Sequence, residues 1–68
     1  MIRIHLSRLM GERRLKIADL VRNTGLSRTT VSRLYHEDSE RIDLDTLEKL
    51  CRYLEVEIAD VLEITDET

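Results

Sequence analysis

The 68-residue sequence contains no proline, tryptophan or phenylalanine, only two glycines and one cysteine. Proline and glycine are the residues that most disfavour a helix interior, so their scarcity favours a helical chain. A single cysteine cannot form a disulfide within the chain, and one cysteine with two distant histidines makes no metal site. We therefore expect no metal and no cofactor, and a small core that association between copies reinforces.

Long apolar runs are also absent, since no more than two hydrophobic residues follow one another. This pattern excludes a membrane span and the apolar region of a signal peptide, so we expect a cytoplasmic protein. The sequence shows no nucleophile, paired-carboxylate or phosphate-loop signature. We expect one domain over residues 1–68, no enzymatic activity and no small-molecule substrate.

The net charge of −3 conceals an uneven distribution. Residues 1–36 carry eight basic and two acidic side chains, a balance of +6, whereas residues 37–68 carry three basic and twelve acidic ones, a balance of −9. The distribution of charge along the chain is therefore more informative than the net charge. The first half can hold a polyanion while the second half faces elsewhere.

The spacing of apolar residues predicts five helices, at about 4–13, 17–23, 28–36, 44–54 and 58–62. Residues 2–4 alternate as a strand does and are expected to be extended or frayed, and 63–68 to be a frayed tail. Gly11 either permits close packing of the first helix or weakens it. The fourth and fifth helices are expected to bury Leu44, Leu47, Leu50, Cys51, Leu54, Ile58, Val61 and Leu62.

Three of these helices are preceded by the same pattern, in which an apolar pair brackets the N-cap position. The caps are Lys16, Ser27 and Asp43, of which only Ser27 and Asp43 are good acceptors for free backbone N–H groups. The bracketing pairs are Leu15 with Leu20, Leu26 with Val31, and Ile42 with Leu47.

The second and third helices and the turn between them, at about 17–36, form the most informative segment. Gly25 suits a tight turn because it adopts positive φ without steric cost. Leu26 fills the angle between the helices, and Val31 and Leu34 face inward. This is a helix-turn-helix arrangement. The exposed face of its second helix consists of short polar and basic side chains without an acid, which suits the major groove of DNA: Arg28, Thr29, Ser32 and Arg33.

The segment from Asp19 to Leu34 resembles the helix-turn-helix core of the Cro and phage-repressor (Xre) family. The segment from Ile42 to Leu54 resembles the fourth helix of its minimal members, and the likeness covers about residues 5–63. The resemblance implies a compact all-α, five-helix, lambda-repressor-like domain that binds DNA as a symmetric dimer. One departure is the acidic loop 36–40, where a carboxylate near the DNA backbone would repel phosphate.

From these observations we expect a dimeric transcription repressor that binds double-stranded DNA with the helix at 28–36. Arg28 and Arg33, with Thr29 and Ser32, are expected to contact bases or phosphates, and Thr30 lies at the edge of that face. Ser27 is a cap that can also meet a phosphate. Phosphate contacts are further expected from Lys16, Arg13 and Arg14, and the dimer interface from Ile58, Val61, Leu62 and Ile64.

A different class of function remains open at this point. The acidic second half of the sequence could bind a protein partner, such as a toxin, a sigma factor or another regulator. An antitoxin that also represses its own operon would combine both functions.

Overall fold

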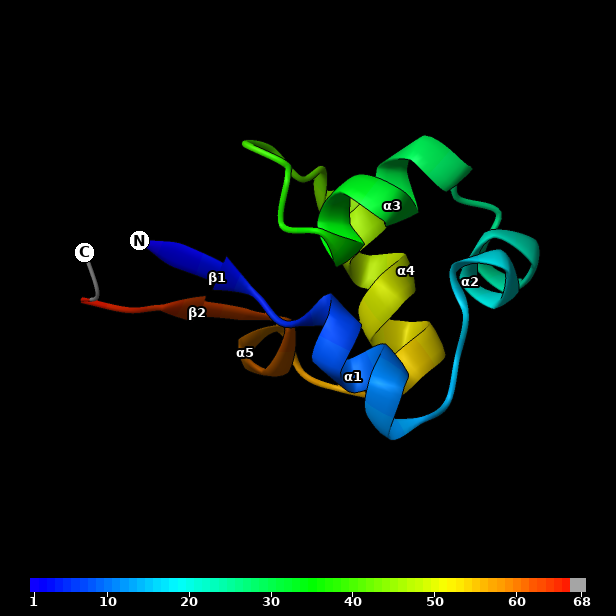
Figure 1. Ribbon diagram of the computed structural model, residues 1–68, viewed down its shortest axis with the longest axis horizontal. Coiled ribbons are helices and arrows are strands. Elements are labelled where there is room, and N and C mark those ends of the chain that lie inside the picture. The colour runs from blue at the N-terminus through cyan, green and yellow to red at the C-terminus, as the bar shows by residue number, and fades with distance from the viewer. Residues whose placement is uncertain (67–68) are drawn as a thin grey trace.

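The computed structural model describes residues 1–66, which form five helices and a two-stranded antiparallel sheet (Figure 1). The protein is mostly helical, as expected, but an all-α class is incomplete because it omits the sheet. The second to fourth helices agree with the predicted ranges to within one residue at either end. The elements in chain order are β1 (Ile2–Ile4), α1 (Leu6–Glu12), α2 (Ile17–Thr24), α3 (Arg28–Tyr35), α4 (Leu44–Leu54), α5 (Ile58–Val61) and β2 (Leu62–Ile64).

The sheet joins the two ends of the chain in a terminal ribbon, defined here as β1 and β2, which projects from the helical body (Figure 1). Ile2 lies opposite Ile64 and Ile4 opposite Leu62. The extended state expected for residues 2–4 is confirmed, although Ile4 belongs to the strand and not to the first helix. The frayed tail is wrong for residues 63 and 64, which are paired in β2, while 67 and 68 lie outside the described residues.

The fifth helix is shorter than predicted. It ends at Val61, because Leu62 is already in extended backbone and starts β2. Val61 is fully buried, as expected, and Leu62 is half-buried. Ile58 is 57% exposed, so the expectation that it belongs to the core is wrong.

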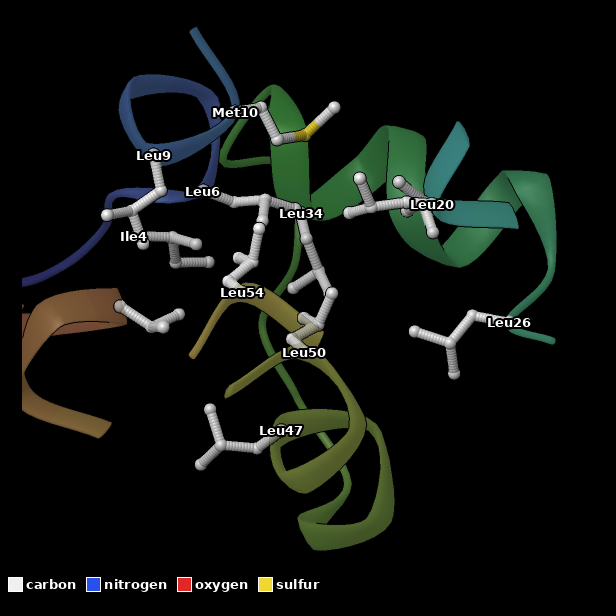
Figure 2. Packing of buried hydrophobic residues seen from close by; sticks show 12 residues of the cluster. Ile4, Leu6, Leu9, Met10, Leu20, Leu26, Leu34, Leu47, Leu50 and Leu54 are labelled. Atoms are coloured by element: carbon white, nitrogen blue, oxygen red, sulfur yellow. The ribbon is translucent and has the colours of Figure 1, made fainter. Parts of the chain in front are cut away.

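Every helix contributes to one core (Figure 2). On α4, apolar side chains recur three and four residues apart, which places them on one face of the helix. Two members of the predicted stripe depart from it: Leu44 stands at the first position of α4 and is 82% exposed, and Cys51 is half-buried. The buried hydrophobic residues are Ile4, Leu6, Leu9, Met10, Leu20, Leu26, Val31, Leu34, Leu47, Leu50, Leu54 and Val61.

The hydrogen bond predicted for Asp43 at the start of α4 is wrong, and the start of α2, where Lys16 was a poor cap, depends on Asp19. Asp43 occupies the N-cap of α4, but its carboxylate accepts from the hydroxyl of Thr46 at 2.9 Å and not from a backbone N–H. At α2, the carboxylate of Asp19 accepts from the backbone N–H of Lys16 at 2.9 Å. This bond lowers the pKa of Asp19, because it favours the charged carboxylate.

Within residues 1–66, no helix is long and apolar enough to cross a membrane. The same residues contain no group of three His, Cys, Asp or Glu side chains placed to hold a metal ion.

Candidate nucleic-acid interface

The turn between α2 and α3 fixes the angle of the two helices. Gly25 adopts φ of +78°, and its N–H donates to the carbonyl of Val21 at 3.2 Å, which closes the last turn of α2. The hydroxyl of Thr24 accepts from the N–H of Leu26 at 3.2 Å. Leu26 is buried in the core, so both the backbone and the side chain of this turn are held in place. The predicted roles of Gly25 and Leu26 are confirmed.

Ser27 starts α3 as predicted. Its Oγ accepts from the backbone N–H of Thr30 at 3.1 Å and donates to the Thr30 hydroxyl at 2.8 Å. Ser27 therefore uses its hydroxyl proton within the fold, and the Thr30 hydroxyl acts as the acceptor of this bond. Thr30 is half-buried, whereas Ser27 is exposed, so Ser27 is the more accessible of the two for an approaching ligand.

The two faces of α3 differ sharply. Val31 and Leu34 point into the core and are almost completely buried, as the spacing predicted. The opposite side exposes Arg28, Thr29 and Arg33, with Ser32 half-buried. Among residues 1–66 neither Arg28 nor Arg33 forms an ion pair. The exposed face of α3 thus presents two guanidinium groups whose hydrogen-bond donors are available to a ligand.

The three basic residues before α2 are placed differently from one another. Lys16 is exposed and lines an open groove together with Arg28, on the side where α2 begins. Arg14 is exposed and adopts φ of +55°. The guanidinium of Arg13 donates to the carbonyl of Leu9 at 3.2 Å and lies 3.7 Å from Glu12. The structure therefore brings Lys16 beside α3 and engages Arg13 within the fold.

Arg41, an exposed residue of the loop before α4, is not singled out by any pattern in the sequence. In the structure Arg41 and Arg33 line the same cleft beyond the end of α3, together with Ser39 and two acids of the loop, Asp38 and Glu40. The available signal was the position of Arg41 in the loop at 36–43, which begins directly at the end of α3.

Glu37, in the acidic loop, is not free to oppose a phosphate. Its carboxylate accepts from Nε and Nη2 of Arg3 at 2.8 and 2.9 Å, and from the backbone N–H of Ile4 at 3.3 Å. The hydrogen bonds from Arg3 are the main reason that the pKa of Glu37 falls to about 2. The terminal ribbon thus holds and compensates this carboxylate, and the loop that follows α3 is bonded to β1.

Comparison with known families supports the helix-turn-helix assignment. The family model that describes the Cro/C1-type HTH DNA-binding domain matches residues 5–67, which include all five helices. A search of curated proteins returned no match.

Proposed function

This chain belongs to the family of Cro/C1-type HTH DNA-binding domains, and we propose that it is a sequence-specific transcription regulator that reads the major groove with α3. The observation that carries the proposal is the exposed face of α3, which has no acid and carries two arginines that form no ion pair with any residue of the described range 1–66. An α-helix fits the major groove, and arginine can donate two hydrogen bonds to O6 and N7 of guanine.

We assign the contacts by position and chemistry. Arg28 and Arg33 contact base edges, and Thr29 and Ser32 contact bases or nearby phosphates. Lys16, which shares a groove with Arg28, contacts phosphate and sets the register of the helix on the duplex. The remaining phosphate contacts fall to Arg14 and Arg41, with smaller parts for Ser27, Thr30 and Arg13, whose side chains already bond within the fold.

We further propose that the protein binds as a homodimer and represses. A two-fold pair of α3 helices would enter successive major grooves about 34 Å apart on a palindromic site. Repression follows if the bound dimer blocks access to a promoter. Of the predicted interface residues, we assign the contact to Ile58, Leu62 and Ile64, which keep exposed surface, and not to Val61, whose side chain is fully buried in the monomer.

The alternative function, a protein-interaction module or antitoxin, depends on an acidic surface in the second half. Many of those acids have partners within the fold. Glu48 pairs with Arg52 at 2.7 Å and Asp45 with Lys49 at 3.1 Å, and Glu63 contacts the ring of His5 at 2.7 Å. This use of the carboxylates favours the DNA-binding proposal.

The deciding experiment is selection of bound duplexes from a random DNA library. We expect one enriched palindromic sequence. Arg28→Ala and Arg33→Ala should each weaken binding to it by about 1–3 kcal/mol and relax selection at one base position. The control is Arg52→Ala, which removes an equal charge from α4, away from α3, and should change affinity little. Enrichment of no sequence would refute specific reading.

Salt dependence tests the electrostatic part of the same proposal. The logarithm of the binding constant should fall with the logarithm of salt concentration with a slope of about −0.9 for each phosphate contacted. Lys16→Ala should make that slope shallower by about 1 without changing the selected sequence. A flat salt profile for the unmodified protein would contradict phosphate binding.

A further inference from the structure

The end of α3 has a pattern of backbone hydrogen bonds that glycine usually completes. The N–H of Asp38 donates to the carbonyl of Arg33 at 2.8 Å, and the N–H of Glu37 donates to the carbonyl of Leu34 at 3.2 Å. In this type of helix end, the residue at the position of Glu37 adopts left-handed backbone, for which glycine is the common choice. Glu37 adopts φ of +56° although it has a Cβ. Such a conformation is disfavoured and persists where surrounding contacts hold the residue in place.

The contacts that hold Glu37 come from the terminal ribbon. Its carboxylate accepts from Nε and Nη2 of Arg3 and from the backbone N–H of Ile4. Figure 1 shows the loop at 36–43 on the side of the molecule from which the ribbon projects. The carboxylate thus joins the loop to β1 through a bidentate ion pair, here called the Arg3–Glu37 clasp, whose paired hydrogen bonds define its geometry closely.

The loop that the clasp holds carries Arg41. This residue lines two clefts beyond the end of α3, and Arg33 and Ser39 line both of them as well. Arg33 is fixed by the helix to which it belongs, whereas Arg41 lies in irregular backbone. Among residues 1–66 Arg41 forms no ion pair, so its place beside Arg33 depends on the course of the loop.

We propose that Glu37, held by Arg3, is a positioning residue for DNA binding: the clasp fixes the loop so that Arg41 contacts the phosphate beside the base that Arg33 reads. This inference rests on the proposed function, which supplies the duplex. A loop that is ordered before binding loses less conformational entropy when the complex forms, so the clasp increases affinity. By its charge alone, Glu37 would lower the affinity for a polyanion, so positioning and charge predict effects of opposite sign.

Binding of the selected duplex by Glu37→Ala tests that sign. We expect affinity to fall on the order of 10-fold, which corresponds to the loss of one charge-assisted hydrogen bond. The salt slope should become shallower by about 1, because the Arg41 contact with phosphate is lost. Asp38→Ala is the matched control, since Asp38 is the next residue of the loop, is exposed, and lines a cleft with Arg41 without joining the clasp. Its loss removes the same charge and should not lower affinity.

Two further variants separate positioning from stability. Glu37→Gly removes the clasp but allows left-handed backbone without a Cβ, so the end of α3 is retained, and we expect the same loss of affinity as in Glu37→Ala. Glu37→Gln keeps an oxygen that accepts a hydrogen bond from Arg3 and should restore part of the affinity. Circular dichroism should show native helix content in each variant. Wild-type affinity in Glu37→Gly would overturn the proposal.

A double-mutant cycle tests whether Arg41 is the residue that the clasp positions. Arg41→Ala should weaken DNA binding by the wild-type chain, but should have little further effect in Glu37→Ala, because the contact is already lost. Equal effects of Arg41→Ala in the two backgrounds would overturn the link between the clasp and Arg41.

Failure of this inference is distinct from failure of the proposed function. A wild-type chain that enriches no duplex would refute the function, and the role of the clasp with it. A wild-type chain that enriches a duplex, while Glu37→Ala binds it as tightly as wild type or more tightly, would uphold the function and overturn the clasp alone.

Discussion

Replacement of Gly25 by alanine tests the turn on which the proposed DNA-binding face depends. Gly25 has φ of +78°, and a Cβ built on it would meet no atom within 4 Å. Gly25→Ala therefore creates no clash with neighbouring side chains, and its whole cost is the left-handed backbone. That conformation costs a residue with a Cβ roughly 1–2 kcal/mol. We expect the free energy of unfolding to fall by about this amount.

The other glycine supplies a control in the same chain. Gly11 lies in the last turn of α1, has no positive φ, and a Cβ there would also meet nothing within 4 Å. Of the two roles left open by the sequence, close packing is thus wrong. Alanine is favoured over glycine inside a helix by roughly 0.5–1 kcal/mol, so Gly11→Ala should stabilise the protein. The same chemical change is expected to act with opposite sign at the two positions.

Urea and thermal denaturation followed by circular dichroism measure both effects. The comparison must be made at one protein concentration, because dimerisation would couple stability to it. A change of 1 kcal/mol should shift Tm by about 4–8 °C in a domain of this size. Gly25→Asn should lie between glycine and alanine, since asparagine tolerates the left-handed region. A Gly25→Ala variant as stable as wild type would refute the strain argument, as would destabilisation by Gly11→Ala.

Three other predictions concern the core, the acidic loop and the thiol. Val31→Asp should unfold the chain, because it buries an unpaired charge, and a soluble helical variant would contradict the inward placement of Val31. The lowered pKa of Glu37 means that its carboxylate contributes stability above its ordinary pKa of 4.5, and that this contribution disappears as pH falls toward about 2. The Tm difference between wild type and Glu37→Gln should therefore be largest at neutral pH and vanish near pH 2, whereas a pH-independent difference would contradict the bond to Arg3. Burial raises the pKa of Cys51, so thiol alkylation near pH 8 should be slower in the native than in the denatured protein, and equal rates would contradict the burial.

Local chemistry explains why the helix-turn-helix could be predicted. The positive φ of Gly25, the N-cap of Ser27 and the inward spacing of Val31 and Leu34 each depend on residues a few positions apart. Propensity, capping and periodicity act over the same short range and agree with one another here. The bounds of α2 to α4 follow from that agreement.

The sheet could not be predicted in the same way, because its pairing joins the two ends of the chain. The alternation in residues 2–4 predicts an extended segment, and residues 62–64 repeat it, but two short alternating segments do not reveal that they pair. Ile58 shows a related failure. Its position in the apolar pattern favours burial, yet α5 has only one turn and Val61 already occupies the core side.

The acidic loop shows how a long-range contact changes the functional interpretation. From sequence, Glu37 is a charge that would repel phosphate close to the end of α3. In the structure Arg3, a basic residue of the first half, forms an ion pair with that carboxylate. The basic excess of residues 1–36 therefore overstates the number of cations available to a polyanion. The acidic excess of residues 37–68 likewise overstates the number of carboxylates that would repel it. What remains near α3 is a smaller and better defined set, in which Arg28, Arg33 and Lys16 face outward without an intramolecular ion pair among residues 1–66. Because recognition depends on this local field and not on the total charge, an acidic protein can carry a DNA-binding face.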